Sequence, residues 1–259
     1  MRKKQFFKIL LISFVAIMLR GILQGIIPTE KSYFEPSMLA KKGIVLPVLI
    51  IYGTVVYMAI SYTFVFAQKG MSGKKLIRGI KFGSLFALMW IVYLLEPMPS
   101  NSVMDMIYYP VIDGVTLVIL GTFLGKFVVQ ETSYTKNSSN KISILRIMII
   151  TLVFTIGRII EYKVFNVNYS QTSTFVWNVA AGSSIGFIFE CLKPALANKS
   201  KIMMSIIFGT VIFGVNLIFF NFFMLVIVKV NVLNLILTTV LDIVFITIGC
   251  FTAVKVKER

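Results

Sequence analysis

Long runs of hydrophobic residues separated by short polar connections dominate the pattern along the chain. A helix needs about 20 predominantly apolar residues to cross the hydrocarbon core of a bilayer. The runs predict eight transmembrane helices, at residues 6–27, 43–67, 79–95, 106–127, 143–165, 174–192, 202–228 and 232–253. We therefore expect an all-α fold, a multi-pass membrane protein with no sizeable domain outside the bilayer.

Two of these spans are less regular than the others. The span 79–95 begins inside a basic stretch, and the span 174–192 contains polar residues, so a seven-span alternative with termini on opposite sides stays open. Lys and Arg of short loops concentrate on the cytoplasmic side. With eight spans, 19 of the 26 Lys and Arg residues fall in cytoplasmic segments and 5 in outer ones. The charge pattern therefore favours eight spans, with both termini cytoplasmic.

The two halves of the chain resemble each other. Corresponding spans align four polar or small positions, Arg20/Arg158, Gly53/Gly182, Gly83/Gly209 and Asp113/Asp242. A polar stretch, 131–142, lies between the halves and predicts a cytoplasmic linker. We therefore expect two four-helix units, residues 1–130 and 143–259, that have the same orientation and form parallel repeats.

Composition agrees with a place in the membrane. The chain is 58% hydrophobic and 14% charged, which is typical of an integral membrane protein. A net charge of +16 would suggest nucleic acid in a soluble protein, but here the basic residues lie between apolar runs. We expect the bilayer as partner, with anionic lipid headgroups at the cytoplasmic loops, and no nucleic acid. No feature identifies a protein partner.

Further compositional features bear on source and chemistry. The bias towards Ile, Lys, Asn and Phe is typical of an AT-rich bacterial genome, which indicates the cytoplasmic membrane as location. The chain has no His and only 2 Cys, so zinc, haem and Ser–His chemistry are not expected. Asp113 and Asp242 could meet as an aspartyl dyad, but each has an Arg candidate in its own half. We therefore expect neither an enzyme nor a cofactor.

Four charged residues lie within apolar spans: Arg20, Asp113, Arg158 and Asp242. An ionisable group at this position costs several kcal/mol unless it is partnered or hydrated. Arg20 and Asp113 each lie about seven residues from the outer end of their span, or roughly 10 Å deep at 1.5 Å per residue. The depths in the second half are comparable, so we predict the pairs Arg20–Asp113 and Arg158–Asp242. The pairs either fix helix packing or line a polar cavity between the repeats.

Other polar residues are weaker candidates for such a cavity. Glu161 lies one turn beyond Arg158 and could compete with Asp242 for it. Glu96 and Glu190 lie near span ends, where we expect their side chains to reach the interface. We expect the amides of Asn178, Asn216 and Asn221 to form interhelical hydrogen bonds, which are a commoner role for such residues than ligand contacts. The candidate lining of a cavity thus comprises Glu161, Asn178, Glu190, Asn216 and Asn221.

Small and aromatic residues predict contacts of the spans. The pattern Gly121-x-x-x-Gly125 is typical of a helix-packing face. Six aromatic residues fit anchors at the membrane–water interface: Trp90, Tyr93, Tyr108, Tyr109, Tyr169 and Trp177.

Two functions remain open on these observations. The first is binding or passage of a small solute or lipid through a polar cavity between two repeats. The second is a non-catalytic membrane accessory, immunity or regulatory subunit. A continuous polar cavity open to one side would favour the first function, and a dry, packed core with an exposed groove would favour the second.

Overall fold

The structure of the protein is a computed structural model that describes residues 3–26, 35–97, 103–129, 142–165 and 171–256. These residues are helical apart from short connections and one isolated β-bridge between Pro36 and Val228. The expected all-α fold is confirmed for this part of the chain. All of the predicted linker 131–142 except Ile142 lies outside the described residues.

The hydrophobic runs of the first half become four long helices and two short ones. Their bounds are α1 Lys3–Gly25, α2 Met38–Lys41, α3 Val45–Ala67, η1 Gln68–Gly70, α4 Lys75–Leu94 and α5 Val103–Phe127. Helix α4 begins at Lys75 and not at the predicted residue 79, and its first turn contains the basic residues Lys75 and Arg78.

The second half has a more divided third segment. Its bounds are α6 Ile144–Val164, α7 Gln171–Leu192, η2 Lys193–Leu196, α8 Lys201–Ile206, the π-helix η3 Ile207–Gly214, α9 Val215–Phe222, α10 Met224–Ile227 and α11 Val232–Lys255. The run predicted at 202–228 therefore follows a helical path interrupted by π-geometry.

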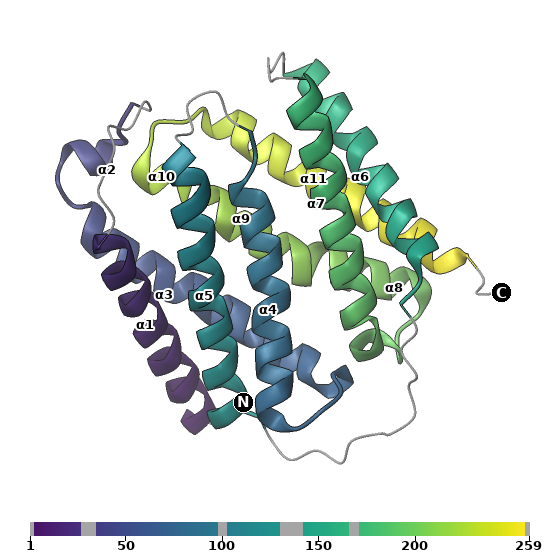
Figure 1. Ribbon diagram of the computed structural model, residues 1–259, viewed down its shortest axis with the longest axis horizontal. Helices are drawn as coiled ribbons and strands as arrows, with labels where there is room; N and C mark the ends of the chain where they lie inside the picture. The colour runs from purple at the N-terminus through teal and green to yellow at the C-terminus, as the bar shows by residue number, and fades with distance from the viewer. Residues whose placement is uncertain (1–2, 27–34, 98–102, 130–141, 166–170, 257–259) are drawn as a thin grey trace.

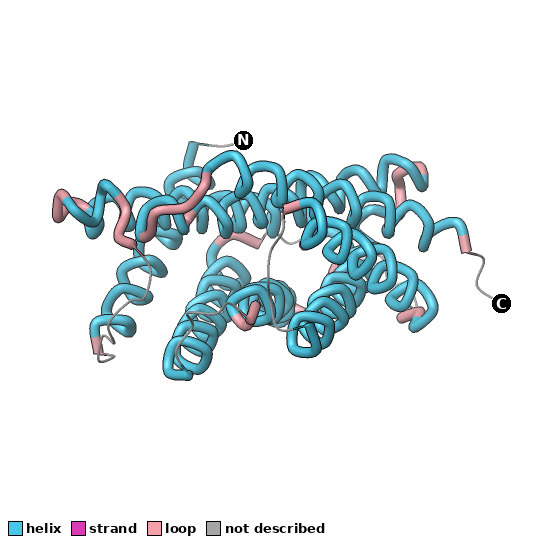
Figure 2. Tube along the Cα trace, turned by 90° about the horizontal axis from the view of Figure 1, so that it is seen from above, coloured by secondary structure: helices cyan, strands magenta, loops and turns pink. Residues whose placement is uncertain are grey.

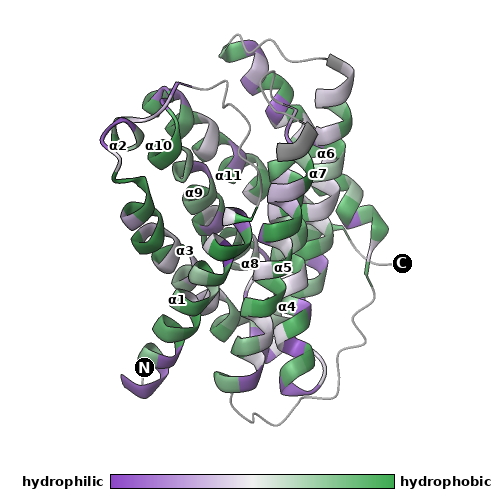
Figure 3. Cartoon of the chain, turned by 60° about the vertical axis from the view of Figure 1, so that its left-hand side comes forward, coloured by the Kyte–Doolittle hydropathy of each residue, from purple (hydrophilic) through white to green (hydrophobic). Residues whose placement is uncertain are grey.

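Among the described residues, seven helical segments are long and apolar enough to cross a membrane. They are Lys3–Gly25, Val45–Gly70, Lys75–Leu94, Met106–Phe127, Thr172–Leu196, Lys201–Ile227 and Val232–Lys255. Large apolar side chains on these helices are exposed, for example Leu11 at 63% and Ile51 at 68%. Hydrophilic residues gather at the helix ends (Figure 3). These features are those of a multi-pass membrane protein.

The long helices form two layers and a closed order of contacts. In Figure 1, α4, α5 and α7 lie in front, and α3, α9 and α11 cross behind them; Figure 2 shows the two layers from above. Neighbouring helices are in contact in the order α1, α5, α4, α7, α6, α11, then η3 with α9, then α3 and back to α1.

Glycines set the closest helix contact, between α4 and α5. A Cβ atom added to Gly79 would collide with the carbonyl oxygen of Gly121, and one added to Gly121 would lie 2.8 Å from Gly83 Cα. A Cβ on Gly125 would lie 2.7 Å from the Lys75 carbonyl oxygen. The predicted packing face of Gly121 and Gly125 is confirmed, and it meets small residues on α4.

Aromatic side chains fill the space between the layers. Trp90, Tyr93 and Trp177 are 7%, 5% and 5% exposed, so their predicted role as interfacial anchors is wrong. The indole N–H groups have partners inside the protein: Trp90 donates to Asn216 Oδ1 at 3.0 Å and Trp177 to the Val92 carbonyl oxygen at 2.6 Å. With these N–H groups bonded internally, burial of the rings is favourable.

Candidate functional site: two buried charge clusters

The first cluster joins α1 and α5 through Arg20 and Asp113. Arg20 Nε donates to Asp113 Oδ1 at 2.5 Å and Nη2 donates to Oδ2 at 3.0 Å. The residues are 7% and 1% exposed, and the Arg20 guanidinium lies 5.0 Å from the ring centroid of Phe223. This is the predicted contact, formed as a bidentate pair in which one cation balances one anion.

The second cluster centres on Arg158 of α6. Its Nη1 donates to Glu161 Oε2 at 3.2 Å and to Asp242 Oδ2 on α11 at 3.3 Å. Its Nη2 donates to Glu96, which follows α4. The structure therefore brings Arg158 and Asp242 together as predicted, but Arg158 is shared with two further carboxyl groups.

Among the residues that the structure describes, the charges of the second cluster do not balance. Glu161 and Asp242 are each 2% exposed, and the Glu96 side chain is 20% exposed. Three carboxyl groups thus surround one guanidinium group in a nearly dry place. A buried charge without compensation costs far more than a paired one. This cluster is consequently suited to an additional positive charge.

Several buried polar atoms around Arg158 lack a hydrogen-bond partner within the described part of the chain. They include Arg158 Nε, Glu161 Oε1, Asp242 Oδ1 and the Tyr93 hydroxyl. Tyr93 interacts electrostatically with the charged groups of Glu96, Arg158, Glu161 and Asp242. Buried polar atoms without partners are uncommon in folded proteins and mark places where a ligand, a water or a proton is expected.

Helix α7 completes the cluster with aromatic and amide groups. The Arg158 guanidinium lies 4.9 Å from the ring centroid of Trp177 and 5.3 Å from that of Tyr162. The Tyr162 hydroxyl donates to Asn178 Oδ1 at 3.0 Å. Rings of this kind attract cations through their faces. Asn178 is therefore the one amide of the predicted set that is connected to the cluster.

The other two amides of that set form interhelical contacts elsewhere. Asn216 accepts from Trp90 and its Nδ2 lies 3.6 Å from Met89 Sδ, which connects α9 to α4. Asn221 Nδ2 donates to Thr239 Oγ1 at 2.8 Å, which connects α9 to α11. Both contacts match the expected interhelical hydrogen bonds.

Glu190 lies in a separate salt bridge at the other end of α6 and α7. It is 1% exposed, so the expectation that it reaches the interface is wrong. Arg146 donates to its two carboxylate oxygens at 2.6 and 2.7 Å, and the Ser143 N–H donates at 3.0 Å. A buried carboxylate is tolerated here because several donors surround it.

Sequence reasoning missed two partners, Glu96 and Arg146. Glu96 is expected at the interface and Arg146 among the basic residues of the cytoplasmic segments, yet Glu96 contacts Arg158 and Arg146 contacts Glu190. The Arg146–Glu190 contact had a usable signal, because consecutive antiparallel helices place the start of one beside the end of the next. Comparisons with known protein families, with curated proteins and with solved structures found no match to this chain.

Proposed function

We propose that this protein is a carrier of the cytoplasmic membrane with eight spans, in which a site around Arg158 takes a small cationic solute between two parallel four-helix repeats. The single observation that carries the proposal is the unbalanced charge of the Arg158 cluster, which is buried where α4 of the first half meets α6, α7 and α11 of the second.

The eighth span would be α6, whose charged residues keep it out of the set of strongly apolar helices. Its Arg146, Arg158 and Glu161 are 5%, 6% and 2% exposed, so these charges face protein partners. Its outward side chains are apolar, with Met148 at 62% and Leu152 at 61% exposure. With 21 residues the helix has the length of a span. An inward charged face and an outward apolar face support a crossing.

The pattern of helix contacts supports the repeats. In the first half, α1 contacts both α3 and α5, and α4 contacts α5; in the second half, α6 contacts both α7 and α11, and η3 contacts α11. Aligned glycines occupy matching contacts. Gly53 packs against Ile17 between the first and second helices of its half, and a Cβ on Gly182 would lie 2.8 Å from Thr151 Cα between the corresponding pair.

Contacts between the halves support a two-fold relation. Helix α4 contacts α7, and α3 contacts α9, so the third helix of each half meets the second helix of the other. Trp90 and Asn216, 126 residues apart and aligned by the offset that relates Gly83 to Gly209, are hydrogen-bonded to each other. Equivalent residues of two parallel repeats touch only near the axis that relates them. The proposed axis therefore passes beside this pair.

The proposed orientation places both termini in the cytoplasm, because the basic residues then concentrate on the inner side. The Arg158 cluster lies towards the outer ends of its helices, and the Arg146–Glu190 bridge lies at the inner ends. Inner loops rich in Lys would attract anionic headgroups.

Binding of organic cations tests the proposed function. Purified protein in detergent would be titrated with methylammonium, choline and spermidine, with the unfolding midpoint as readout, because a ligand of the folded state raises it. Transport of a cation that raises the midpoint would then be followed in proteoliposomes. We expect at least one of the three cations to raise the midpoint, and Glu96→Gln to weaken its binding by about tenfold, or 1.4 kcal/mol.

Glu190→Gln is the matched control, since it removes a buried carboxylate outside the cluster. Cation binding that is the same in wild type and Glu96→Gln, or no effect of any of the three cations, would contradict the proposed site.

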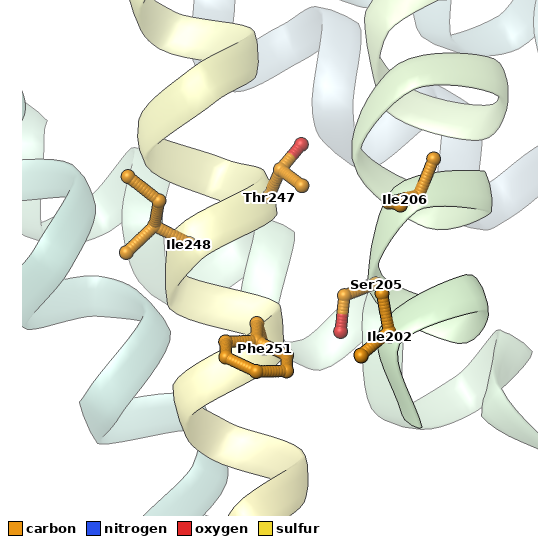
Figure 4. Close-up of a pocket in the computed structure, with 6 residues that line it drawn as sticks. All are labelled: Ile202, Ser205, Ile206, Thr247, Ile248 and Phe251. Atoms are coloured by element: carbon orange, nitrogen blue, oxygen red, sulfur yellow. The ribbon is translucent and has the colours of Figure 1, made fainter. Parts of the chain in front are cut away.

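A second function, that of an accessory or regulatory subunit, is favoured by a different observation. An apolar groove of about 220 Å³ opens between α8 and α11 and is lined by Ile202, Ser205, Ile206, Thr247, Ile248 and Phe251 (Figure 4). This groove and the packed aromatic interior are the features expected of the second function, and the groove suits the helix of a membrane partner. Ile202→Trp, at a lining residue that is 58% exposed, would fill the groove. Loss of a co-purifying membrane protein with unchanged cation binding would support this function.

A further inference from the structure

We infer that Glu161 and Asp242 share one exchangeable proton, which makes this carboxyl pair the proton-binding site of the Arg158 cluster. The inference names the ion that would be exchanged for a cationic solute, and in that role it rests on the proposed function. The presence of the proton itself follows from the geometry of the pair.

The carboxyl groups of Glu161 and Asp242 both contact the same nitrogen atom of Arg158. Glu161 Oε2 and Asp242 Oδ2 lie 3.2 and 3.3 Å from the same Arg158 Nη1. Both residues are 98% buried, so two negative charges this close repel each other strongly. A proton shared by two neighbouring carboxyl groups removes one charge and replaces the repulsion with attraction.

Within the described ranges of the chain, the remaining groups around the pair supply no second cation. Helix α4 and the residues after it contribute Tyr93 and Glu96, α6 contributes Arg158 and Tyr162, and α7 contributes Trp177 and Asn178. Among these groups Arg158 is the only positive charge, and Glu96 already engages its Nη2. The local charge of the described groups is therefore negative by two before any proton is added.

Unpaired atoms give the proton a place. Glu161 Oε1 and Asp242 Oδ1 are buried and have no hydrogen-bond partner among the described residues, and the same holds for the hydroxyl of Tyr93, which is 5% exposed. Each carboxyl thus has one oxygen on Arg158 and one oxygen that can carry or accept a proton. A tyrosine hydroxyl can both donate and accept a hydrogen bond, so the Tyr93 hydroxyl adds a further polar group to the surroundings of the pair.

The first half of the chain provides an internal comparison. Asp113 has both oxygens bonded to Arg20, so its charge is already balanced and no proton is needed. The alignment that pairs Arg20 with Arg158 places Leu23 opposite Glu161, and the one that pairs Gly83 with Gly209 places Phe222 opposite Glu96. Extra carboxyl groups are thus a property of the second cluster alone among these aligned positions.

Infrared spectroscopy of the full-length protein in nanodiscs at neutral pH tests the inference. A protonated carboxyl group has a C=O stretching band that carboxylates lack and that shifts in D₂O. We expect one such band in the wild type and its loss in both Glu161→Gln and Asp242→Asn. Each variant leaves Arg158 with two carboxyl partners, so at least one of them is expected to fold.

Glu35→Gln serves as the control, because this exposed carboxylate lies outside the spans, and it should keep the band. Absence of the band in wild type, or its persistence in both cluster variants, would overturn the inference. The two proposals fail separately. A band without binding of any ammonium compound would remove the carrier function and leave the proton site, whereas cation binding without a band would do the reverse.

Discussion

Arg20 and Arg158 occupy aligned positions but meet different surroundings. In the described part of the chain, Arg20 has one carboxylate partner and the ring of Phe223, whereas Arg158 has three carboxyl partners and two rings. A buried one-to-one pair fixes packing, and it is sensitive to the loss of either member. An unbalanced cluster has charge left to bind a ligand. We therefore propose a packing role for the first cluster and a binding role for the second.

Stability measurements can separate these two roles. Asp113→Asn leaves the Arg20 charge buried and unbalanced, so we expect a loss of about 3–5 kcal/mol in the free energy of unfolding. Asp242→Asn should cost much less, because Arg158 keeps Glu96 and Glu161. Denaturant unfolding of the purified proteins in the same detergent measures both. Equal losses in the two variants would contradict the distinction.

The double variant Arg20→Leu/Asp113→Leu provides the control for the first cluster. Replacement of a buried ion pair by apolar residues is often neutral or stabilising. We expect this variant to recover most of the stability lost in Asp113→Asn. A double variant as unstable as the single one would show that shape, and not the stranded charge, determines the loss.

At the scale of the helix, the α4–α5 contact depends on the absence of side chains. Gly79→Ala would drive a methyl group into the backbone of Gly121 and Gly125. Overpacking of this kind costs about 1–3 kcal/mol. Gly21→Ala on α1 is a matched control, since a Cβ there meets nothing within 4 Å, and alanine in a helix is favoured over glycine by about 1 kcal/mol. Thermal unfolding should therefore move in opposite directions in the two variants.

A second contact at this scale joins the connection before α2 to the connection between α10 and α11. The Lys229 N–H donates to the Glu35 carbonyl oxygen at 2.8 Å and the Ser37 N–H to that of Ile227 at 3.0 Å. The Glu35 carboxylate accepts from Lys41 Nζ at 2.8 Å and from Lys229 Nζ at 2.9 Å. Hydrogen bonds from these lysines lower the pKa of Glu35 from its ordinary value of 4.5 to about 2.

The lowered pKa of Glu35 predicts that this contact between the two connections depends on pH. Since the folded-state pKa lies below the ordinary one, the stabilisation is complete above pH 4.5 and is lost as the pH falls through about 2. We expect the Ser37 and Lys229 amides to exchange more slowly with deuterium in wild type than in Glu35→Gln near neutral pH. The difference in exchange rate between the two proteins should vanish as the pH falls through about 2. Equal protection of the Ser37 and Lys229 amides in wild type and Glu35→Gln at neutral pH would contradict this prediction.

At the scale of the whole molecule, α6 decides the topology. If it crosses the membrane, both termini lie on the same side, which is the cytoplasm in the proposed orientation. If it does not, the seven remaining spans place them on opposite sides. We expect green fluorescent protein fused after Arg259 to fluoresce and alkaline phosphatase at the same site to be inactive. The opposite pair of results would support seven spans. A fusion after Lys136, expected in the cytoplasm in either arrangement, is the control.

The sequence by itself determined the helical class, the positions of seven helices long and apolar enough to cross a membrane, and the Arg20–Asp113 and Arg158–Asp242 contacts. The length of a hydrophobic run and the cost of an isolated charge in lipid depend on residues that are close together in the sequence, so both can be predicted from the sequence alone. Only the tertiary structure decided that Glu96 and Glu161 join Arg158, that Glu190 is buried on Arg146, and that Trp90 and Trp177 face inward. Those outcomes depend on which helices become neighbours and how each is rotated, and apolar sequences specify neither.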